Sequence, residues 1–187
     1  MNKMEQVSIN KNMKLSEHFS LGELTKTKYQ TADGNIPSRV VIENLKRICR
    51  WLEELRFRYN ERYVLEHVVH TGGRPQSKVA GDCTLAPDPG TAPEPEEPII
   101  INSGYRSPEV NRLAGGAKNS NHLTGCAVDI RTYGMEQAMR YAVILMDYAD
   151  DSNLNFDEIL IEKNRYGTIW LHFAVRPKDN RRKVAFI

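Results

Sequence analysis

The sequence predicts an α+β fold in which a mainly antiparallel sheet is flanked by helices. Two long segments, 38–59 and 135–148, repeat apolar residues at the 3.6-residue period of a helix. Shorter segments show the apolar runs or the alternation of strands, and they lie near 99–102, 127–131, 157–162 and 168–175. A short turn joins the last two strands, which makes them a hairpin and the sheet at least partly antiparallel.

The bulk composition is that of one ordinary globular domain. The expected single domain, residues 1–187, is long enough to bury a hydrophobic core without disulfides or a structural metal. The net charge is only +2 and the basic residues are dispersed, which argues against a nucleic-acid-binding surface. No apolar run approaches the length of a membrane span, so we expect no membrane insertion, and we expect a monomer.

The cysteines and the first residues of the chain indicate the cellular compartment that we expect. Cys49, Cys83 and Cys126 cannot all pair with one another and form no CxxC motif, so a reducing compartment is the simpler interpretation. The first residues lack the apolar segment of a signal peptide, and we therefore expect none.

The first half of the chain supplies scaffold. A short helix is expected to begin at Leu21, because Ser20 and Glu23 have the spacing of a capping box. The helix over 38–59 has one apolar stripe and a charged, solvated remainder. That stripe is expected to consist of Val41, Leu45, Ile48, Leu52 and Leu55.

Two features separate this helix from the second half. Residues 63–70 have the composition of a strand. A Pro/Gly-rich stretch at about 72–98 follows and contains six of the nine prolines, so we expect an insertion with little regular structure.

The strand near 99–102 delivers Arg106 to a strand-to-helix junction. Ser107 is expected to cap a helix that has Pro108 at its first position and runs to about Leu113. An arginine fixed at such a junction can bind a carboxylate with two hydrogen bonds or stabilise a developing oxyanion.

The stretch from Ser120 to Asp129 suggests a metal site. Along 127–131, Val128 and Ile130 point to the core and Asp129 points to the other face. A turn at Gly125 can fold the His122 imidazole over the Asp129 carboxylate. Cys126 shares the parity of Val128, so we reject it as a ligand.

A third ligand is available on the strand near 168–175. There Ile169, Leu171 and Phe173 form the apolar face, and His172 lies on the other. If both strands belong to one sheet, His172 and Asp129 share its polar face. With His122 they make a His, Asp, His set with an open position, which is the ligand count of a catalytic zinc site.

The helix over 135–148 completes the predicted fold. Its apolar stripe is expected to consist of Met139, Ala142, Val143 and Met146 and to pack on the sheet. The tail from Arg176 to Lys183 is basic and is expected to be exposed.

These motifs resemble the zinc peptidases of the D-Ala-D-Ala carboxypeptidase group, peptidase family M15. The resemblance rests on Ser-x-His-x-x-Gly-x-Ala-x-Asp from Ser120, on Trp170-x-His172, on the Ser103-Gly104-Tyr105-Arg106-Ser107 run, on Gly115 to Ser120, and on Phe19 to Thr25. It is closest to the small, phage-associated and Bacteroidetes-type branch and covers roughly 15–62 and 97–187. It implies a hedgehog/DD-peptidase-like fold and a Zn2+ cofactor.

The resemblance also implies a reaction and several roles. The expected function is zinc-dependent hydrolysis of a peptide bond in peptidoglycan stem peptides, by a carboxypeptidase or an endopeptidase. Arg106 is the arginine that contacts substrate in this family. We expect Ser120 to bind substrate or orient His122, and Trp170 to wall the pocket.

The general base departs from the family pattern. Some members place an acid three residues before the last histidine, where this chain has Ile169, and others a histidine two residues before it, where it has Trp170. Glu162, on the neighbouring strand, is our candidate base, followed by Glu158 and then Asp157.

The missing acid leaves a second function open. Hedgehog signalling domains resemble this fold and keep a zinc site without being known chiefly as peptidases. The alternative is therefore a zinc-containing cell-wall-binding module without hydrolytic activity. Without a signal peptide, the protein is expected to be cytoplasmic, or to reach the cell wall by a phage-type lysis route.

Overall fold

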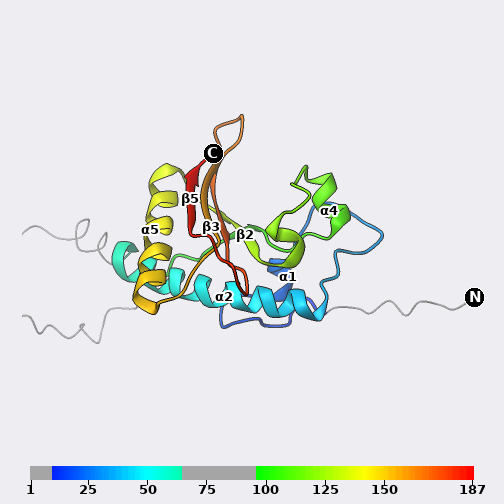
Figure 1. Cartoon of the computed structure of the whole chain (residues 1–187), viewed down its shortest axis with the longest axis horizontal. Helices are drawn as coiled ribbons and strands as arrows, with labels where there is room; N and C mark the ends of the chain where they lie inside the picture. Colours follow the sequence, from blue (N-terminus) through cyan, green and yellow to red (C-terminus); the bar gives the residue numbers. More distant parts are fainter. Residues whose placement is uncertain (1–9, 65–95) are drawn as a thin grey trace, which may run out of the picture.

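The computed structural model describes residues 10–64 and 96–187 and has an α+β fold, as the sequence predicts (Figure 1). Its helical elements are α1 (Leu21–Leu24), α2 (Arg39–Tyr59), the π-helical turn η1 (Asn60–Val64), α4 (Pro108–Leu113), the 3-10 turn η2 (Asn121–Thr124) and α5 (Met135–Ser152). Its strands are β1 (Ile101–Ser103), β2 (Ala127–Arg131), β3 (Glu158–Lys163), β4 (Ile169–Ala174) and β5 (Lys183–Phe186).

The strands form one mixed sheet in the order β1-β2-β4-β3-β5. The β1–β2, β2–β4 and β3–β4 pairings are antiparallel, and β3 pairs with β5 in parallel. The predicted hairpin is therefore confirmed, and the sheet is mainly antiparallel. β5 was not predicted; it begins at Lys183, where the tail that we expected to be exposed ends, and its residues are largely exposed.

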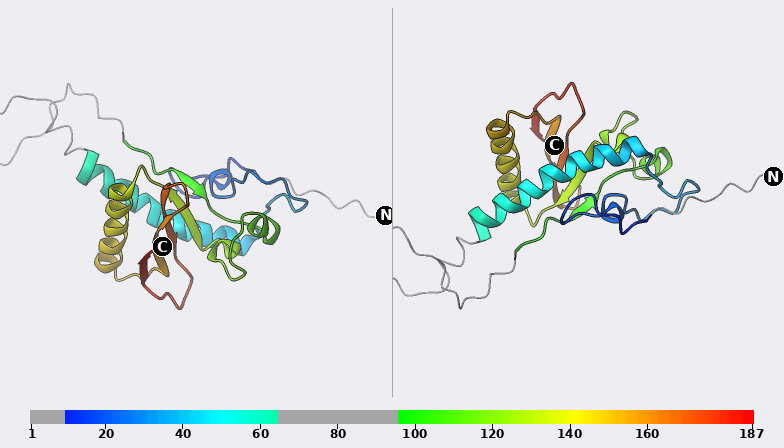
Figure 2. Two further views of the ribbon diagram at one scale, coloured as in Figure 1. Left: turned by 90° about the horizontal axis from the view of Figure 1, so that it is seen from above. Right: turned by 90° about the horizontal axis from the view of Figure 1, so that it is seen from below.

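Helices α2 and α5 lie against the sheet, and α2 crosses it in the views of Figure 2. The predicted stripe of α2 is confirmed, since Leu45, Ile48 and Leu52 are fully buried. Trp51 of α2 packs its ring 4.8 Å from that of Tyr148 of α5 and 5.3 Å from that of Phe173 of β4. The two helices thus cover the face that carries Phe173, which leaves the opposite face of β2 and β4 for polar side chains.

The buried stripe of α5 differs from the prediction. Met139 is 54% exposed and Val143 is 41% exposed, whereas Tyr141 and Leu145 are buried. The Tyr141 ring lies 4.8 Å from that of Tyr59 in α2. Of the predicted stripe, Ala142 is buried and Met146 is partly buried against the core, so the prediction holds for these two residues. The core side is completed by Ala138, Tyr141, Ile144, Leu145 and Ala149.

The strand expected over 63–70 is wrong where it can be compared. Tyr63 and Val64 belong to η1, which continues α2, and the Tyr63 ring packs 5.5 Å from that of Tyr59. The rest of that segment, Cys83 and most of the 72–98 insertion lie outside the described residues. Among the helices of the described ranges, none combines the length and the apolar character needed to cross a membrane.

Candidate metal centre

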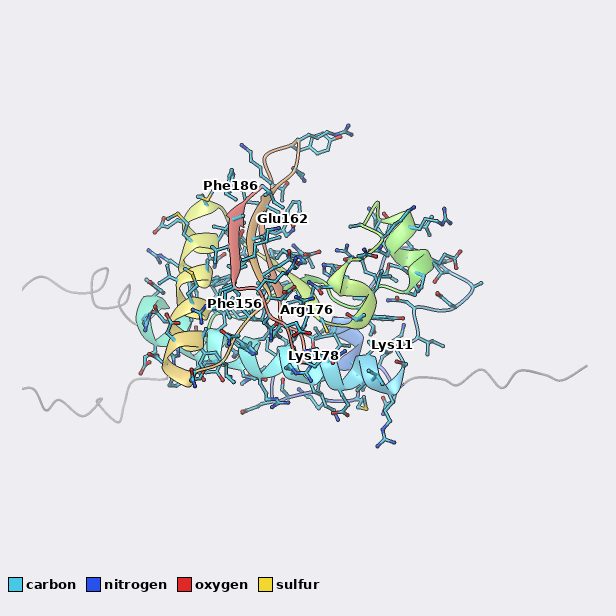
Figure 3. All side chains as sticks on the ribbon, viewed as in Figure 1. Lys11, Phe156, Glu162, Arg176, Lys178 and Phe186 are labelled. Carbon is cyan, nitrogen blue, oxygen red and sulfur yellow. The ribbon has the colours of Figure 1, made fainter. Side chains whose placement is uncertain are left out.

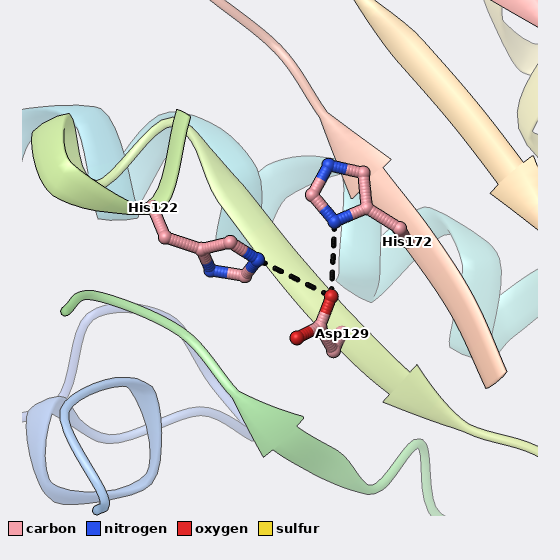
Figure 4. A group of neighbouring side chains, drawn as sticks. All are labelled: His122, Asp129 and His172. Carbon is pink, nitrogen blue, oxygen red and sulfur yellow. Dashed lines mark hydrogen bonds and ion pairs between the residues drawn. The ribbon is translucent and has the colours of Figure 1, made fainter. Parts of the chain in front are cut away.

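Three buried side chains that the sequence singles out meet on the polar face of the sheet. They are His122, Asp129 and His172, and each offers a ligand atom within 4.8 Å of those of the other two (Figure 4). Asp129 Oδ1 lies 3.2 Å from His122 Nε2 and 2.9 Å from His172 Nδ1. Two imidazole nitrogens and a carboxylate oxygen therefore converge on one point.

The register of the sheet places two of these ligands. Asp129 of β2 is directly opposite His172 of β4, so their side chains leave the same face of the sheet as neighbours. The alternation inferred from the sequence, with Val128 and Phe173 buried on the other face, is what brings the pair together.

Backbone contacts of η2 place the third ligand. Ser120 caps this turn, and its hydroxyl accepts the His122 backbone N–H at 3.3 Å. Gly125 ends the turn in the left-handed region at φ 69°, and a Cβ there would meet the Val41 carbonyl oxygen at 2.9 Å. Glycine thus allows the chain to reverse against α2 and enter β2 directly, which folds His122 back over Asp129.

The orientation of the His122 ring is fixed from behind. Its Nδ1 lies 2.7 Å from the Gly104 carbonyl oxygen, which accepts the Nδ1–H and leaves the Nε2 lone pair directed at the site. Gly104 can approach because it has no side chain, since a Cβ there would lie 2.2 Å from the Leu24 carbonyl oxygen.

Arg106 braces the second oxygen of Asp129. Its Nη2 donates to Asp129 Oδ2, and its Nε donates to the Ser103 hydroxyl at 2.8 Å. The backbone N–H of Arg106 also donates to the His122 carbonyl at 3.1 Å. Within the described residues, Nη1 makes no hydrogen bond, so this end of the guanidinium remains available at the pocket that Arg106 lines.

The cluster strongly favours charged forms. Burial opposes ionisation of Asp129, but His122 and His172 outweigh it and hold the carboxyl pKa far below its usual range. Burial lowers the pKa of His172, yet its hydrogen bond to Asp129 and its ion pair with Glu158 raise the pKa to about 9. A metal bound at His172 would therefore displace a proton from its ring.

The cluster forms one wall of a pocket of about 710 Å³. The pocket is also lined by the other residues that the sequence singles out, namely Arg106, Ser120, Glu158, Glu162 and Trp170. The lining is completed by the loop residues 114–117, Asn119, Asn121, Leu160, Arg176 and Arg181. The cluster is thus open on the side from which a substrate would approach.

The candidate bases differ sharply in environment. Burial raises the pKa of Glu162, with a further contribution from Asp129. Glu162, which is labelled in Figure 3, is paired with Trp170 of β4, and both residues line the pocket. The ion pair with His172, together with Arg181, lowers the pKa of Glu158 to about 2 against the effect of burial. Of the two, Glu162 is better suited to accept a proton.

The third candidate base is occupied elsewhere. The Asp157 side chain is fully buried and accepts hydrogen bonds from Arg176 at 2.6 Å, from Arg181 at 2.7 Å and 2.8 Å, and from Asn121 at 2.8 Å. Burial opposes ionisation, but Arg181 and Asn121 lower its pKa to about 2. Asp157 is absent from the pocket lining, and its role is to tie β3 to η2 and to the loop after β4.

Sequence reasoning missed the network around Asn121. The Asn121 amide donates to Asp157 Oδ2 at 2.8 Å and to Glu158 Oε2 at 3.1 Å, so it joins the turn that carries His122 to β3. These residues are far apart in the chain, and no spacing within the sequence points to their contact.

The donor set fits zinc. Imidazole nitrogen and carboxylate oxygen are ligands that zinc accepts, and three protein ligands beside an open position are typical of catalytic zinc. The described cluster contains no cysteine, and Cys126, which we rejected as a ligand, is buried with its Sγ 3.8 Å from the Thr124 carbonyl oxygen.

Comparison with known proteins points to one family. Residues 94–151 match the family model for peptidase M15. This segment contains Arg106, Ser120, His122 and Asp129, whereas Glu162 and His172 lie beyond it. The match supports the M15 peptidase family and, with it, a metallopeptidase. None of the curated proteins compared with the chain matches it.

Proposed function

We propose that this chain is a zinc-dependent peptidase that hydrolyses a peptide bond in peptidoglycan stem peptides, as a carboxypeptidase or an endopeptidase. The observation that carries the proposal is the convergence of His122, Asp129 and His172 in an open pocket that also holds a half-buried glutamate. The peptidase M15 match supports the same reaction class.

The ligand atoms follow from the orientation of each ring. His122 would bind the metal through Nε2, since its Nδ1 proton is directed at the Gly104 carbonyl. His172 would bind through Nδ1 and Asp129 through Oδ1, the atoms that face each other at 2.9 Å. When bound, zinc supplies a Lewis acid that activates water and polarises a carbonyl oxygen.

Glu162 is the proposed general base. Its carboxylate takes a proton from the attacking water and returns it to the nitrogen of the leaving amine. Burial raises its pKa, which brings its proton affinity closer to what such a shuttle needs near neutral pH. Glu158 and Asp157 are each held by arginine, so they are poor alternatives.

Two further side chains act on the substrate. Arg106, held at Asp129 and Ser103, presents Nη1 to a substrate carboxylate or to the oxygen that gains charge during attack. Trp170 forms a flat wall next to Glu162. Ser120 is engaged with the His122 backbone, so orienting His122 is its first role.

Mass spectrometry of purified peptidoglycan fragments tests the proposal. Zinc-loaded protein is expected to release a new product that a chelator-treated sample does not release, and the product mass identifies the cleaved bond. If zinc binds at one per chain and no product forms, the protein is instead a zinc-containing cell-wall-binding module. With that outcome, Glu162 would not be a general base.

A further inference from the structure

We infer that Glu158 is a positioning residue for His172, because its carboxylate is placed to accept the Nε2 proton and so present Nδ1 to the metal. The inference rests on the proposed zinc site and adds to it a residue that acts on the metal through His172 and does not bind the metal itself. Its basis is the pair of acceptors found behind the two imidazole rings.

The two histidines are held in parallel ways. In His122, one ring nitrogen faces Asp129 and the other donates to the Gly104 carbonyl at 2.7 Å. In His172, Nδ1 faces Asp129 at 2.9 Å, and Nε2 faces Glu158 Oε2 at 3.7 Å. A metal-binding histidine usually donates its second ring N–H to an acceptor that fixes the tautomer and the ring orientation.

Glu158 is itself held in place. Its Oε1 pairs with Arg181 at 3.0 Å and with Lys183 at 3.4 Å, and its Oε2 accepts from Asn121 at 3.1 Å. The side chain is only 14% exposed. A carboxylate that is fixed on both oxygens can define the position of a ring beside it, whereas a free surface carboxylate cannot.

The anchoring residues connect both histidine-bearing elements. Asn121 precedes His122 in η2, and Glu158 lies on β3 next to the strand that carries His172. The Asn121–Glu158 hydrogen bond therefore links the two ligand positions through a path that avoids the metal. The distance of 3.7 Å from His172 Nε2 to Glu158 Oε2 is longer than a hydrogen bond. We therefore expect this distance to shorten to about 3 Å when Nδ1 binds the metal.

Zinc affinity, measured by competition with a chromogenic chelator, tests this role. Glu158→Ala is expected to weaken zinc binding about 10- to 100-fold, as is typical of lost partners behind a metal ligand. Glu158→Gln keeps an acceptor oxygen and is expected to recover part of that loss. The matched control is Glu162→Ala, which removes the same charge from the same face of β3 at a residue that does not contact His172 Nε2. We expect this control to lose less zinc affinity than Glu158→Ala.

Nuclear magnetic resonance of the zinc-loaded protein adds a readout that does not depend on catalytic activity. The Nε2–H of His172 is expected as a downfield signal protected from solvent exchange, and the signal should be lost in Glu158→Ala. Wild-type affinity in Glu158→Ala, an equal loss in Glu162→Ala, or an unprotected Nε2–H would each overturn the inference. Failure of the wild type to bind zinc would instead overturn the proposed function.

Discussion

At the scale of single residues, Asp129 is the residue that connects the other side chains of the candidate metal centre. Its Oδ1 faces both histidines, and its Oδ2 accepts from Arg106. It lies buried on β2 with these three side chains as its partners. A single carboxylate thus orients two potential metal ligands and the arginine proposed to contact substrate.

Asp129→Asn tests that assignment with little change in shape. The neutral amide is a weak zinc ligand, and it leaves Arg106 without its anionic partner, so zinc content should fall from one per chain to near none. Metal content after gel filtration measures the effect. Asp147→Asn, at a carboxylate of α5 that is 43% exposed, is the matched control and should keep its zinc. Equal zinc content in the two variants would contradict the proposed ligand set.

The residues that could be predicted are those fixed by local pattern. The alternation of Val128 and Ile130 identified the face of Asp129, and the same argument placed His172. Glu158 was weighed only as a base, because its contacts with Asn121, Arg181 and His172 depend on how β3, η2 and the tail meet in space. No periodicity within one segment encodes such contacts.

At the scale of elements, the site depends on how closely β1 approaches α1. The Tyr105 backbone N–H donates to the Leu24 carbonyl at 2.7 Å, and the preceding Gly104 accepts from His122. This approach places an acceptor behind the His122 ring without using a side chain.

Gly104→Ala should therefore destabilise the fold. The new Cβ would lie 2.2 Å from the Leu24 carbonyl oxygen, and because this atom is backbone, the cost should reach the upper end of overpacking, about 3 kcal/mol. Urea denaturation measures the change. Gly167→Ala, at φ 85° with open space around it, should cost only about 1 kcal/mol for its left-handed backbone. If Gly104→Ala lowers the unfolding free energy no more than Gly167→Ala does, the close approach of Gly104 to the Leu24 carbonyl is contradicted.

The junction between β3 and the tail should respond to acid. Arg181 and Asn121 lower the pKa of Asp157 from 3.8 to about 2 despite its burial, and Glu158 shares Arg181. Since the folded-state pKa is depressed, the contribution of Asp157 is present above its ordinary pKa and is lost as the pH falls from about 4 to about 2. The difference between these two pKa values corresponds to about 2 kcal/mol of unfolding free energy.

Asp157→Asn isolates this contribution. The variant should be less stable than the wild type near neutral pH by about 3 kcal/mol, because two arginines lose a buried partner. The difference in unfolding free energy should narrow by about 2 kcal/mol between about pH 4 and pH 2. A difference that stays constant across this range would show that the charge of Asp157 does not stabilise the fold.

Elements with one strongly apolar face were predictable, and those without one were not. The stripe of α2 follows directly from Leu45, Ile48 and Leu52. In α5 the core side includes Ile144 and Leu145 beside Tyr141, whereas the predicted Met139 and Val143 are exposed. Apolar residues occur on more than one side of this helix, so hydrophobicity alone did not identify its core side. β5 gave no signal because it is an edge strand whose Val184 and Phe186 are more than half exposed.

At the scale of the whole molecule, the sheet separates stability from chemistry. One face packs against α2 and α5 through Phe173 and its neighbours, and the other carries the histidines and the pocket. The two ligand-bearing strands, β2 and β4, lie side by side within the sheet. A metal on the polar face would therefore hold together η2 and both strands.

Zinc should accordingly stabilise the folded protein. A ligand at about 100 times its Kd adds about 2.7 kcal/mol, which corresponds to a rise in Tm of roughly 5–10 °C for a chain of this size. Differential scanning fluorimetry with zinc and with chelator measures this shift. Asp129→Asn should show none, and a wild-type Tm that is independent of zinc would contradict a metal bound only by the folded state.

The most direct test of the account is the rate of peptidoglycan-fragment hydrolysis by Glu162→Gln, with zinc content measured on the same sample. The amide keeps the size of the side chain but cannot accept the proton. We expect full zinc occupancy and a rate reduced about 10²- to 10⁴-fold relative to the wild type. Hydrolysis at the wild-type rate, with zinc bound, would contradict the claim that this pocket uses Glu162 as the base of a zinc peptidase.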